Sequence, residues 1–233
     1  MEITALLPMK GHSERVPNKN LKMFAGKALY HAVMKALRNS EYVRKTVINT
    51  DGDAIADDVR KYFPETQIIS RPEEIQGDFV SMNKIIAYDL SQLEGEHFLQ
   101  THSTNPLLTS ATLDGAIEVY FNNLDKYDSL FSVTRLQTRL YRQDGSPVNH
   151  NPNELIRTQD LPPIFEENSN FYIFSKTSFN DAKKNRIGLR PQMYEIDKLE
   201  AIDIDEQQDF ELAEILYKMR KGLPQRASGT QRR

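Results

Sequence analysis

A chain of 233 residues with 39% hydrophobic and 27% charged side chains has the composition of a globular protein, long enough for one large domain. No segment approaches the roughly 18 apolar residues of a membrane-spanning helix, and the absence of cysteine excludes disulfides, thiolate metal sites and cysteine nucleophiles. The formal net charge of −3 gives no reason to expect nucleic acid or an anionic membrane as a partner. Glu2 stands where a signal peptide would carry a basic residue, so we expect a cytoplasmic protein whose anion sites are local.

Short apolar segments alternate with amphipathic segments along most of the chain. The apolar segments predict strands at 3–9, 46–50, 66–70, 97–101, 129–133 and 170–175. The amphipathic segments predict helices at 28–40, 53–63, 81–93 and 113–124, and a last helix through Phe210, Leu212, Ala213, Leu216 and Tyr217. Such alternation is typical of a mostly parallel sheet that helices cover on both faces.

The alternation fails between about 135 and 165, where the chain is polar and rich in proline and asparagine. A stretch of this length is either a surface excursion or an arm that exchanges with a second subunit. The last residues, 223–233, are polar and lack periodicity. We therefore expect a single domain over 1–222, followed by a flexible C-terminal tail.

The loop after the first predicted strand is unusually cationic. Lys10, Arg15 and Lys19 lie there, at the edge of a parallel sheet where ligands bind. The motifs GxxxxGK[ST] and GxGxxG are both absent, but Gly11 and Ser13 would let backbone N–H groups approach phosphate oxygens. The pattern indicates either a phosphate-binding loop or a solvated charged loop.

Two carboxylates near the C-terminus form a second candidate site. On a strand, Asp203 and Asp205 would point to one face and Ile204 to the other. A pair of carboxylates beside a phosphate suits Mg²⁺, which takes few protein oxygens. Alternatively, Asp205 and Gln208 form a capping box before the last helix, and Asp203 faces solvent.

Two further polar stretches accompany predicted strands and helices. Ser103, Thr104 and Asn105 follow the strand at 97–101 and are candidates for contact with a base or ribose. The alternative is structural, with Thr109 as the N-cap of the next helix. Ser81 is predicted to be another N-cap, at a helix N-terminus that is also suited to face an anion.

Six segments, in the same order, resemble motifs of the acylneuraminate cytidylyltransferase family. The first, PMKGHSERVPNKN, is similar to the family's Pro-x-Arg-Gly-Gly-Ser-Lys-x-x-Pro-x-Lys-Asn stretch. The others are NTDGDAIAD, RPEEIQGDFVS, TNPLLT, RTQDLPPIFEENSNFYIF and AIDIDEQQDFELAE, and together the resemblance covers 3–220. The chain departs from the family pattern at Lys10, His12, Glu14 and His102, where relatives carry Arg, Gly, Lys and Gln.

The resemblance implies a fold and an activity. The fold would be a three-layer α/β/α nucleotidyltransferase, GT-A-like and Rossmann-like, with a mostly parallel sheet and a protruding dimerisation arm. The activity would be transfer of CMP from CTP to the anomeric hydroxyl of a nonulosonic, sialic-acid-like sugar acid, by a homodimer that needs neither nucleic acid nor membrane. Alternatives are another acceptor such as Kdo, a GT-A-like glycosyltransferase, or a non-catalytic nucleotide-sugar-binding relative.

The resemblance also assigns roles to individual residues. It makes Lys10, Lys19, Asp203 and Asp205 catalytic, and it makes the two aspartates the ligands of Mg²⁺. It gives nucleotide binding to Gly11, Ser13, Arg15, Asn20 and Ser81. It places the sugar acid near His102, Thr104, Asn105 and Asn168.

Overall fold

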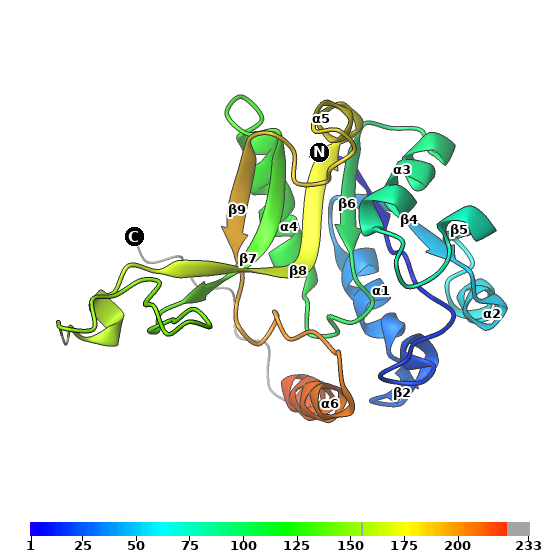
Figure 1. Cartoon of the computed structure of the whole chain (residues 1–233). Helices are drawn as coiled ribbons and strands as arrows, with labels where there is room; N and C mark the ends of the chain where they lie inside the picture. Colours follow the sequence, from blue (N-terminus) through cyan, green and yellow to red (C-terminus); the bar gives the residue numbers. More distant parts are fainter. Residues whose placement is uncertain (155, 223–233) are drawn as a thin grey trace.

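Seven strands form one sheet in the computed structural model, which describes residues 1–154 and 156–222 (Figure 1). The strands are β1 (Ile3–Leu6), β4 (Val43–Thr50), β5 (Gln67–Ser70), β6 (His97–Thr101), β7 (Ser129–Leu136), β8 (Ile164–Ser175) and β9 (Pro191–Glu195). Their order is β5-β4-β1-β6-β8-β7-β9, and within this sheet only β8 runs antiparallel to its neighbours. The predicted mostly parallel sheet is therefore confirmed.

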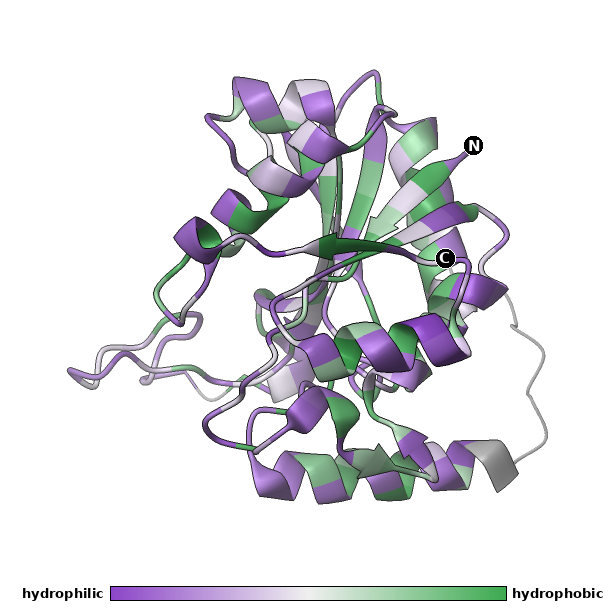
Figure 2. Ribbon diagram, turned by 90° about the vertical axis from the view of Figure 1, so that its right-hand side faces the viewer, coloured by the Kyte–Doolittle hydropathy of each residue, from purple (hydrophilic) through white to green (hydrophobic). Residues whose placement is uncertain are grey.

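Helices cover both faces of the sheet. One face carries α1 (Tyr30–Asn39), α2 (Asp53–Tyr62) and α4 (Ser110–Asn122), and the other carries α3 (Met82–Gln92) and α5 (Lys176–Asp181). The period-two alternation of β1 feeds both cores, because Ala5 packs with the first group and Leu6 with the second. Figure 2 shows the hydrophobic segments gathered in the strands between the helices. The three-layer α/β/α prediction is confirmed.

A third core ties the C-terminal helix to the cleft region. The hairpin of β2 (Met23–Phe24) and β3 (Lys27–Ala28) packs with α1 against α6 (Gln207–Gly222), as Figure 1 shows at the bottom of the molecule. The rings of Phe24 and Phe210 meet edge to face, with centroids 5.5 Å apart. Ile204 is fully buried in the same core, so this packing holds the segment that carries Asp203 and Asp205.

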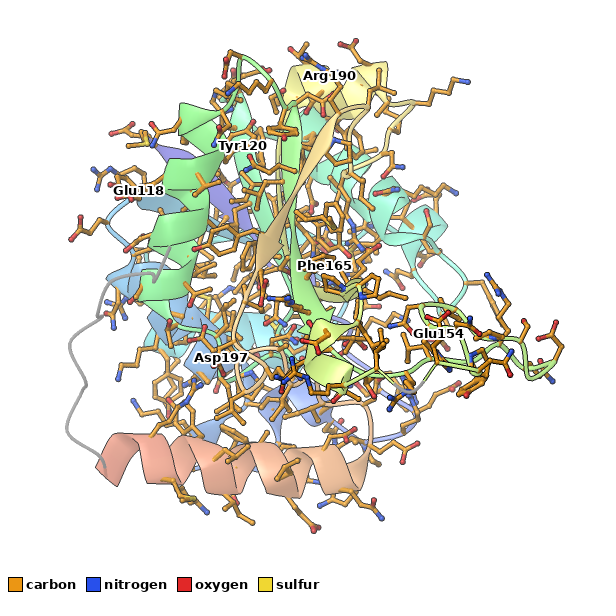
Figure 3. The ribbon with its side chains drawn as sticks, turned by 90° about the vertical axis from the view of Figure 1, so that its left-hand side faces the viewer. Glu118, Tyr120, Glu154, Phe165, Arg190 and Asp197 are labelled. Carbon is orange, nitrogen blue, oxygen red and sulfur yellow. The ribbon has the colours of Figure 1, made fainter. Side chains whose placement is uncertain are left out.

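An arm leaves the body of the protein between β7 and β8. The two strands stay paired as far as Leu136 and Ile164, and the chain between them extends away from the sheet. Figure 3 shows Phe165 near the root of this arm and Glu154 far out on it. The irregular stretch expected at 135–165 corresponds to the arm, whereas the predicted tail at 223–233 lies outside the described residues.

Several short elements carry no sequence pattern and are absent from the predictions. The β2–β3 hairpin has two residues in each strand, α5 has six residues, and β9 begins at a proline. Elements this short do not complete the period that reveals a helix or strand. In the part of the chain that the structure describes, every helix is too short or too polar to cross a membrane.

Candidate functional site

A cleft of about 310 Å³ opens beyond the carboxyl ends of β1 and β6. This is the edge of a parallel sheet where ligands of α/β proteins bind. The cleft is lined mainly by the cationic loop and by the polar segment after β6. Its lining residues are Pro8, Met9, Lys10, His12, Ser13, Glu14, Arg15, Val16, Lys19, Asn20, Asp78, Met82, His102, Ser103 and Thr104.

The cationic loop meets the segment that carries the two aspartates. The Arg15 guanidinium lies 2.6 Å from Asp205 Oδ1, and the half-buried Lys19 donates through Nζ to the carbonyl of Ile204. About 185 residues separate these partners in sequence. The fold therefore brings the predicted phosphate loop and the predicted metal carboxylates into one site.

The two aspartates lie on an irregular segment, so the expectation that they lie on a strand is wrong. Desolvation by the surrounding protein raises the pKa of Asp203, and the like charge of Asp205 adds to this, although water still reaches the Asp203 side chain. A Thr104 hydrogen bond and the Lys19 charge act in the opposite direction. The two carboxylates thus form a crowded pair that an added cation would stabilise.

The proposed capping box does not form. The backbone N–H groups of Asp205 and Glu206 donate to Asp209 Oδ2, at 3.0 and 2.8 Å, so Asp209 caps the start of α6. The Asp205 carboxylate pairs with Arg15 instead. This removes the structural explanation for Asp205 and leaves its side chain on Arg15, which lines the cleft.

Lys10 bridges the mouth of the cleft. Its Nζ lies 2.8 Å from Asp78 Oδ1, in the loop before α3, and the hydrogen bond and charge of Lys10 lower the pKa of Asp78. Both side chains are exposed to water, as are those of Arg15 and Asp205. Exposed pairs of this kind contribute little to stability, because water screens the charges. An incoming polyanion can therefore exchange either carboxylate for its own oxygens at little cost.

Gly11 is required for packing, which differs from the role expected for it. A Cβ at Gly11 would lie 2.8 Å from the Cα of Gly52, and a Cβ at Gly52 would lie 2.7 Å from the Cα of Gly11. The close approach lets the Gly11 N–H donate to Asp51 Oδ1 at 2.6 Å. Because that N–H is occupied, Gly11 shapes the loop and its amide is not free for a phosphate oxygen.

Asn20 is a second loop residue with an internal role. It is buried, its Nδ2 donates to the carbonyl of Lys10 at 2.9 Å, and its Oδ1 accepts from Ser103 Oγ at 2.6 Å. These bonds tie the cationic loop to the segment after β6. Asn20 therefore positions the loop, whereas Ser13, also on the cleft wall, makes no hydrogen bond through its hydroxyl within the described residues.

A buried polar chain supports the floor of the cleft. Asn49 donates to Asp89 Oδ1 at 2.5 Å and accepts from Arg71 Nε at 2.7 Å. Arg71 also donates to the carbonyl of Met9 at 3.1 Å and lies 4.0 Å from Asp51. Since Met9 and Gly11 begin the cationic loop, this chain links α3 and β4 to the position of the loop.

We expect the substitution Asp89→Asn to change how stability depends on pH. Burial raises the Asp89 pKa from its ordinary value to about 7, so between these two values the folded protein binds a proton that the unfolded chain has released. Wild-type stability contributed by this group therefore falls as pH rises from about 4 to about 7. The neutral amide keeps an acceptor for Asn49 and lacks this dependence.

Denaturant unfolding at pH 5 and pH 8 measures the effect. From pH 5 to pH 8, the free energy of unfolding of the wild type should fall relative to that of the variant by an amount on the order of a few kcal/mol. If the free energy of unfolding changes equally in the two proteins, Asp89 is ionised at both pH values because Arg71 stabilises its charge. The exposed Asp125, which makes no hydrogen bond or ion pair with the described residues, provides the control variant Asp125→Asn.

The four residues expected at the sugar lie in different places. His102 and Thr104 line the cleft. Asn105 is buried behind it, where its Nδ2 donates to the carbonyl of Ile202. Asn168 lies in β8 at an irregularity of the ladder, and its amide bonds Ser132, Thr134 and the Asn170 N–H. These partners bond both amide atoms of Asn168, whereas Asn105 Oδ1 is buried without a hydrogen-bond partner among the described residues. Contact with a sugar stays a prediction for both residues.

The two predicted N-caps differ. Thr109 caps α4 as expected, since its Oγ1 accepts from the Thr112 N–H at 3.2 Å. Ser81 occupies the N-cap position of α3, but its side chain makes no capping hydrogen bond. The Ser81 hydroxyl is therefore not committed to the helix.

Four side chains important to this site were missed from the sequence. Asp51 follows β4 at the same edge of the sheet as the cationic loop, so the rule of strand ends would have found it. Asp78 and Arg71 lie between β5 and α3, and Arg186 lies between α5 and β9. Arg71 and Asp78 lie in RPEEIQGDFVS, one of the segments that resemble the family, but no role was assigned to them. The segment of Arg186 has neither a periodic pattern nor a matching motif.

The two aspartates are a small set for a metal ion. In the described parts of the chain, no group of three or more His, Asp or Glu side chains is arranged to hold a metal. Two carboxylates are sufficient for Mg²⁺ when substrate phosphates and water complete its shell. Asp203 and Asp205, with one pKa raised partly by the other, fit that donor set.

Comparison with known proteins gives consistent matches over almost the whole chain. The sequence profile of a family described as "Cytidylyltransferase" matches residues 4–226. N-acylneuraminate cytidylyltransferase of Escherichia coli is 28% identical over 225 residues, which are 91% of this chain and 51% of that protein. Pseudaminic acid cytidylyltransferase of Campylobacter jejuni is 25% identical over 232 residues, 94% of this chain and 97% of that protein. The chain thus spans about half of the first relative and nearly all of the second.

Solved structures share the fold. CMP:2-keto-3-deoxy-manno-octonic acid synthetase, in complex with CTP, gives a TM-score of 0.71 at 12% identity and covers 94% of this chain and 100% of its own. 4-Diphosphocytidyl-2C-methyl-D-erythritol synthase gives a TM-score of 0.68 at 16% identity, with 93% and 99% covered. At these identities the likeness concerns the fold alone.

Proposed function

The chain belongs to the cytidylyltransferase family, and on this premise we propose that it transfers CMP from CTP to a nonulosonic, sialic-acid-like sugar acid. The names of its relatives support the acceptor class, since they act on N-acylneuraminate and on pseudaminic acid. One observation carries the proposal. The cationic loop, which lines a cleft beyond the strand ends, contacts the segment of Asp203 and Asp205, although the two are far apart in sequence.

The proposed reaction is a displacement at the α-phosphorus of CTP. The oxygen of the anomeric hydroxyl forms a bond to that phosphorus, the bond to the bridging oxygen of the β-phosphate breaks, and pyrophosphate leaves while the hydroxyl loses its proton. Such reactions depend mainly on positioning and on stabilisation of charge. The protein must therefore supply cations to the triphosphate and hold the acceptor in line.

Three cations of the loop are available for the triphosphate. Lys10 and Arg15 are held by exposed carboxylates that phosphate oxygens can replace. Lys19 is anchored on Ile204, where burial lowers its pKa and Asp203 and Asp205 counteract that effect. A lysine meets phosphate as a point charge, so the Lys10 of this chain retains charge but not the bidentate fork of the arginine in its relatives.

Mg²⁺ is the proposed cofactor, and Asp203 and Asp205 would hold it. When bound, it would polarise phosphate oxygens and offset the charge that develops on them. The chain's own part is to keep the two carboxylates together, through Thr104 on Asp203 and through the burial of Ile204 between them. Ser13 and Ser81 are the proposed hydroxyl contacts to the nucleotide.

The arm supports a further part of the proposal, a homodimer. Tyr141, Val148, Ile156 and Phe165 expose apolar side chains on and beside the arm, and such side chains are a common feature of contact surfaces. The molar mass in solution, measured by light scattering, is expected to be twice the 26.9 kDa of the chain. A mass of one chain at micromolar concentration would contradict the homodimer.

A pyrophosphate-release assay tests the proposed reaction. It combines each of four nucleoside triphosphates with N-acetylneuraminic acid, pseudaminic acid, Kdo and N-acetylmannosamine in the presence of Mg²⁺. We expect release with CTP and one of the first two acids. Release with Kdo alone favours the Kdo acceptor, and release with another nucleotide excludes the cytidylyl reaction. No release with any pair favours a non-catalytic binding protein.

A further inference from the structure

Arg186 is a half-buried cation that the proposed reaction does not use. It lies in the segment between α5 and β9, on the face of the sheet that α3 covers. Its guanidinium lies 3.6 Å from the ring centroid of Tyr172 and donates through Nη1 to Gln100 Oε1. Gln100 and Tyr172 are both fully buried and face each other in the β6–β8 ladder. The guanidinium is therefore held in a fixed place by two rigid strands.

No protein carboxylate neutralises Arg186 within the described residues, where no Asp or Glu oxygen lies within ion-pair distance of it. The nearby Glu167 accepts a hydrogen bond from the Tyr172 hydroxyl instead. Removing a charge from water without an ion pair is unfavourable, and this desolvation lowers the pKa of Arg186, while Tyr172 and the charge of Glu167 act in the opposite direction. A largely desolvated cation without an ion pair is stabilised where a ligand supplies the anion.

His102 connects Arg186 to the cleft. It follows Gln100 by two residues, lines the cleft, and has its Nε2 buried without a hydrogen-bond partner among the described residues. Burial and the Arg186 charge lower the His102 pKa to about 4, so the ring is neutral near pH 7. A neutral ring with an unpaired nitrogen, near a guanidinium that has no ion-pair partner among the described residues, presents two polar groups to one ligand.

The positions of the other cations indicate which ligand anion would neutralise Arg186. Lys10, Arg15 and Lys19 lie on the loop after β1, where the triphosphate would be bound. A sugar acid brings its own carboxylate, which the triphosphate repels and which needs a separate cation. A guanidinium binds a carboxylate through two parallel hydrogen bonds. Arg186 is not on that loop and bonds Gln100 of β6, two residues before His102, which suits this separate role.

We propose that Arg186, together with His102, binds the carboxylate of the acceptor and makes the enzyme select sugar acids over neutral sugars. This subsite rests on the proposed function, because that function supplies the acid. The competing explanation is structural, with Arg186 bracing the segment before β9 through Tyr172 and Gln100. That explanation predicts lower stability but unchanged discrimination between an acid and its ester.

Binding measurements on the full chain test the subsite. Calorimetry with a non-hydrolysable CTP analogue present compares N-acetylneuraminate, pseudaminate and Kdo with their methyl esters. The variants are Arg186→Gln, Arg186→Lys, and the control Arg190→Gln. Arg190 is exposed directly before β9, where Figure 3 labels it, and it bonds Asp128 only through its backbone N–H and carbonyl.

The expected result is a loss of discrimination. The wild type should bind at least one acid at least tenfold more tightly than its ester, and Arg186→Gln should weaken the acid about 10- to 100-fold and leave the ester unchanged. Arg186→Lys should bind the acid with an affinity between those of the wild type and Arg186→Gln. Affinity for the CTP analogue, and the midpoint of thermal unfolding of Arg190→Gln, should stay as in the wild type.

The remaining outcomes show which of the two proposals fails, the subsite, the reaction or both. An Arg186→Gln variant that keeps the acid-to-ester ratio overturns the subsite, whether or not pyrophosphate is released. Acid binding that depends on Arg186 without pyrophosphate release supports the subsite and contradicts the proposed function. A wild type that binds none of the three acids, or prefers their esters, overturns both.

Discussion

Replacing Asp203 by Asn is expected to lower Mg²⁺-dependent pyrophosphate release by at least about a thousandfold. The amide removes the charge that a divalent cation needs but keeps an oxygen that can accept the Thr104 hydrogen bond. It also removes the repulsion from Asp205, which helps to raise the Asp203 pKa. The substitution should therefore leave the fold intact or slightly more stable while it disables the proposed metal site.

The experiment measures initial rates over a range of Mg²⁺ concentrations and the thermal unfolding of each protein. The control is Asp125→Asn, because Asp125 is exposed and has no side-chain partner among the described residues. Asp205→Asn should also lose most activity, and in addition it should free Arg15 from its ion pair. Asp203→Asn activity within tenfold of the wild type at saturating Mg²⁺ would falsify the metal role of Asp203.

Most of the fold could be predicted from the sequence because its long elements each complete several periods. β6 was expected at the residues where it occurs, and the other long strands differ from expectation mainly at their ends. The short β2–β3 hairpin and β9 could not be found, because neither has a periodic pattern. Their positions depend on tertiary packing, such as the contact of Phe24 with Phe210.

The site shows the same division between local and tertiary information. Lys19 and the two aspartates were expected from charge pattern and resemblance, and the structure places them together. Asn20, Asn105 and Asn168 were expected at ligands, and each also makes a hydrogen bond within the protein. A sequence motif shows that an amide is needed but not whether its partner is a ligand or the backbone.

The substitution Lys19→Met is expected to lower kcat/KM for CTP by about 100-fold or more. Lys19 is half-buried between the cationic loop and the 203–205 segment, and its Nζ donates to the carbonyl of Ile204. It is therefore a fixed charge at the place where charge on the phosphates would develop, which a mobile surface lysine could not replace. Methionine preserves much of the length of the side chain and removes only the charge and the donor.

Steady-state kinetics with CTP and the sugar acid varied in turn distinguish the possible roles of Lys19. We expect the KM for the acid to change less than about threefold, because Arg186 is the cation proposed for the acceptor. Lys45→Met is the control, since Lys45 is exposed on β4 and has no side-chain partner among the described residues. A loss confined to affinity for the acid would contradict the phosphate role. A lower unfolding temperature with unchanged turnover would mean that Lys19 only anchors Ile204, so that the triphosphate depends on Lys10 and Arg15.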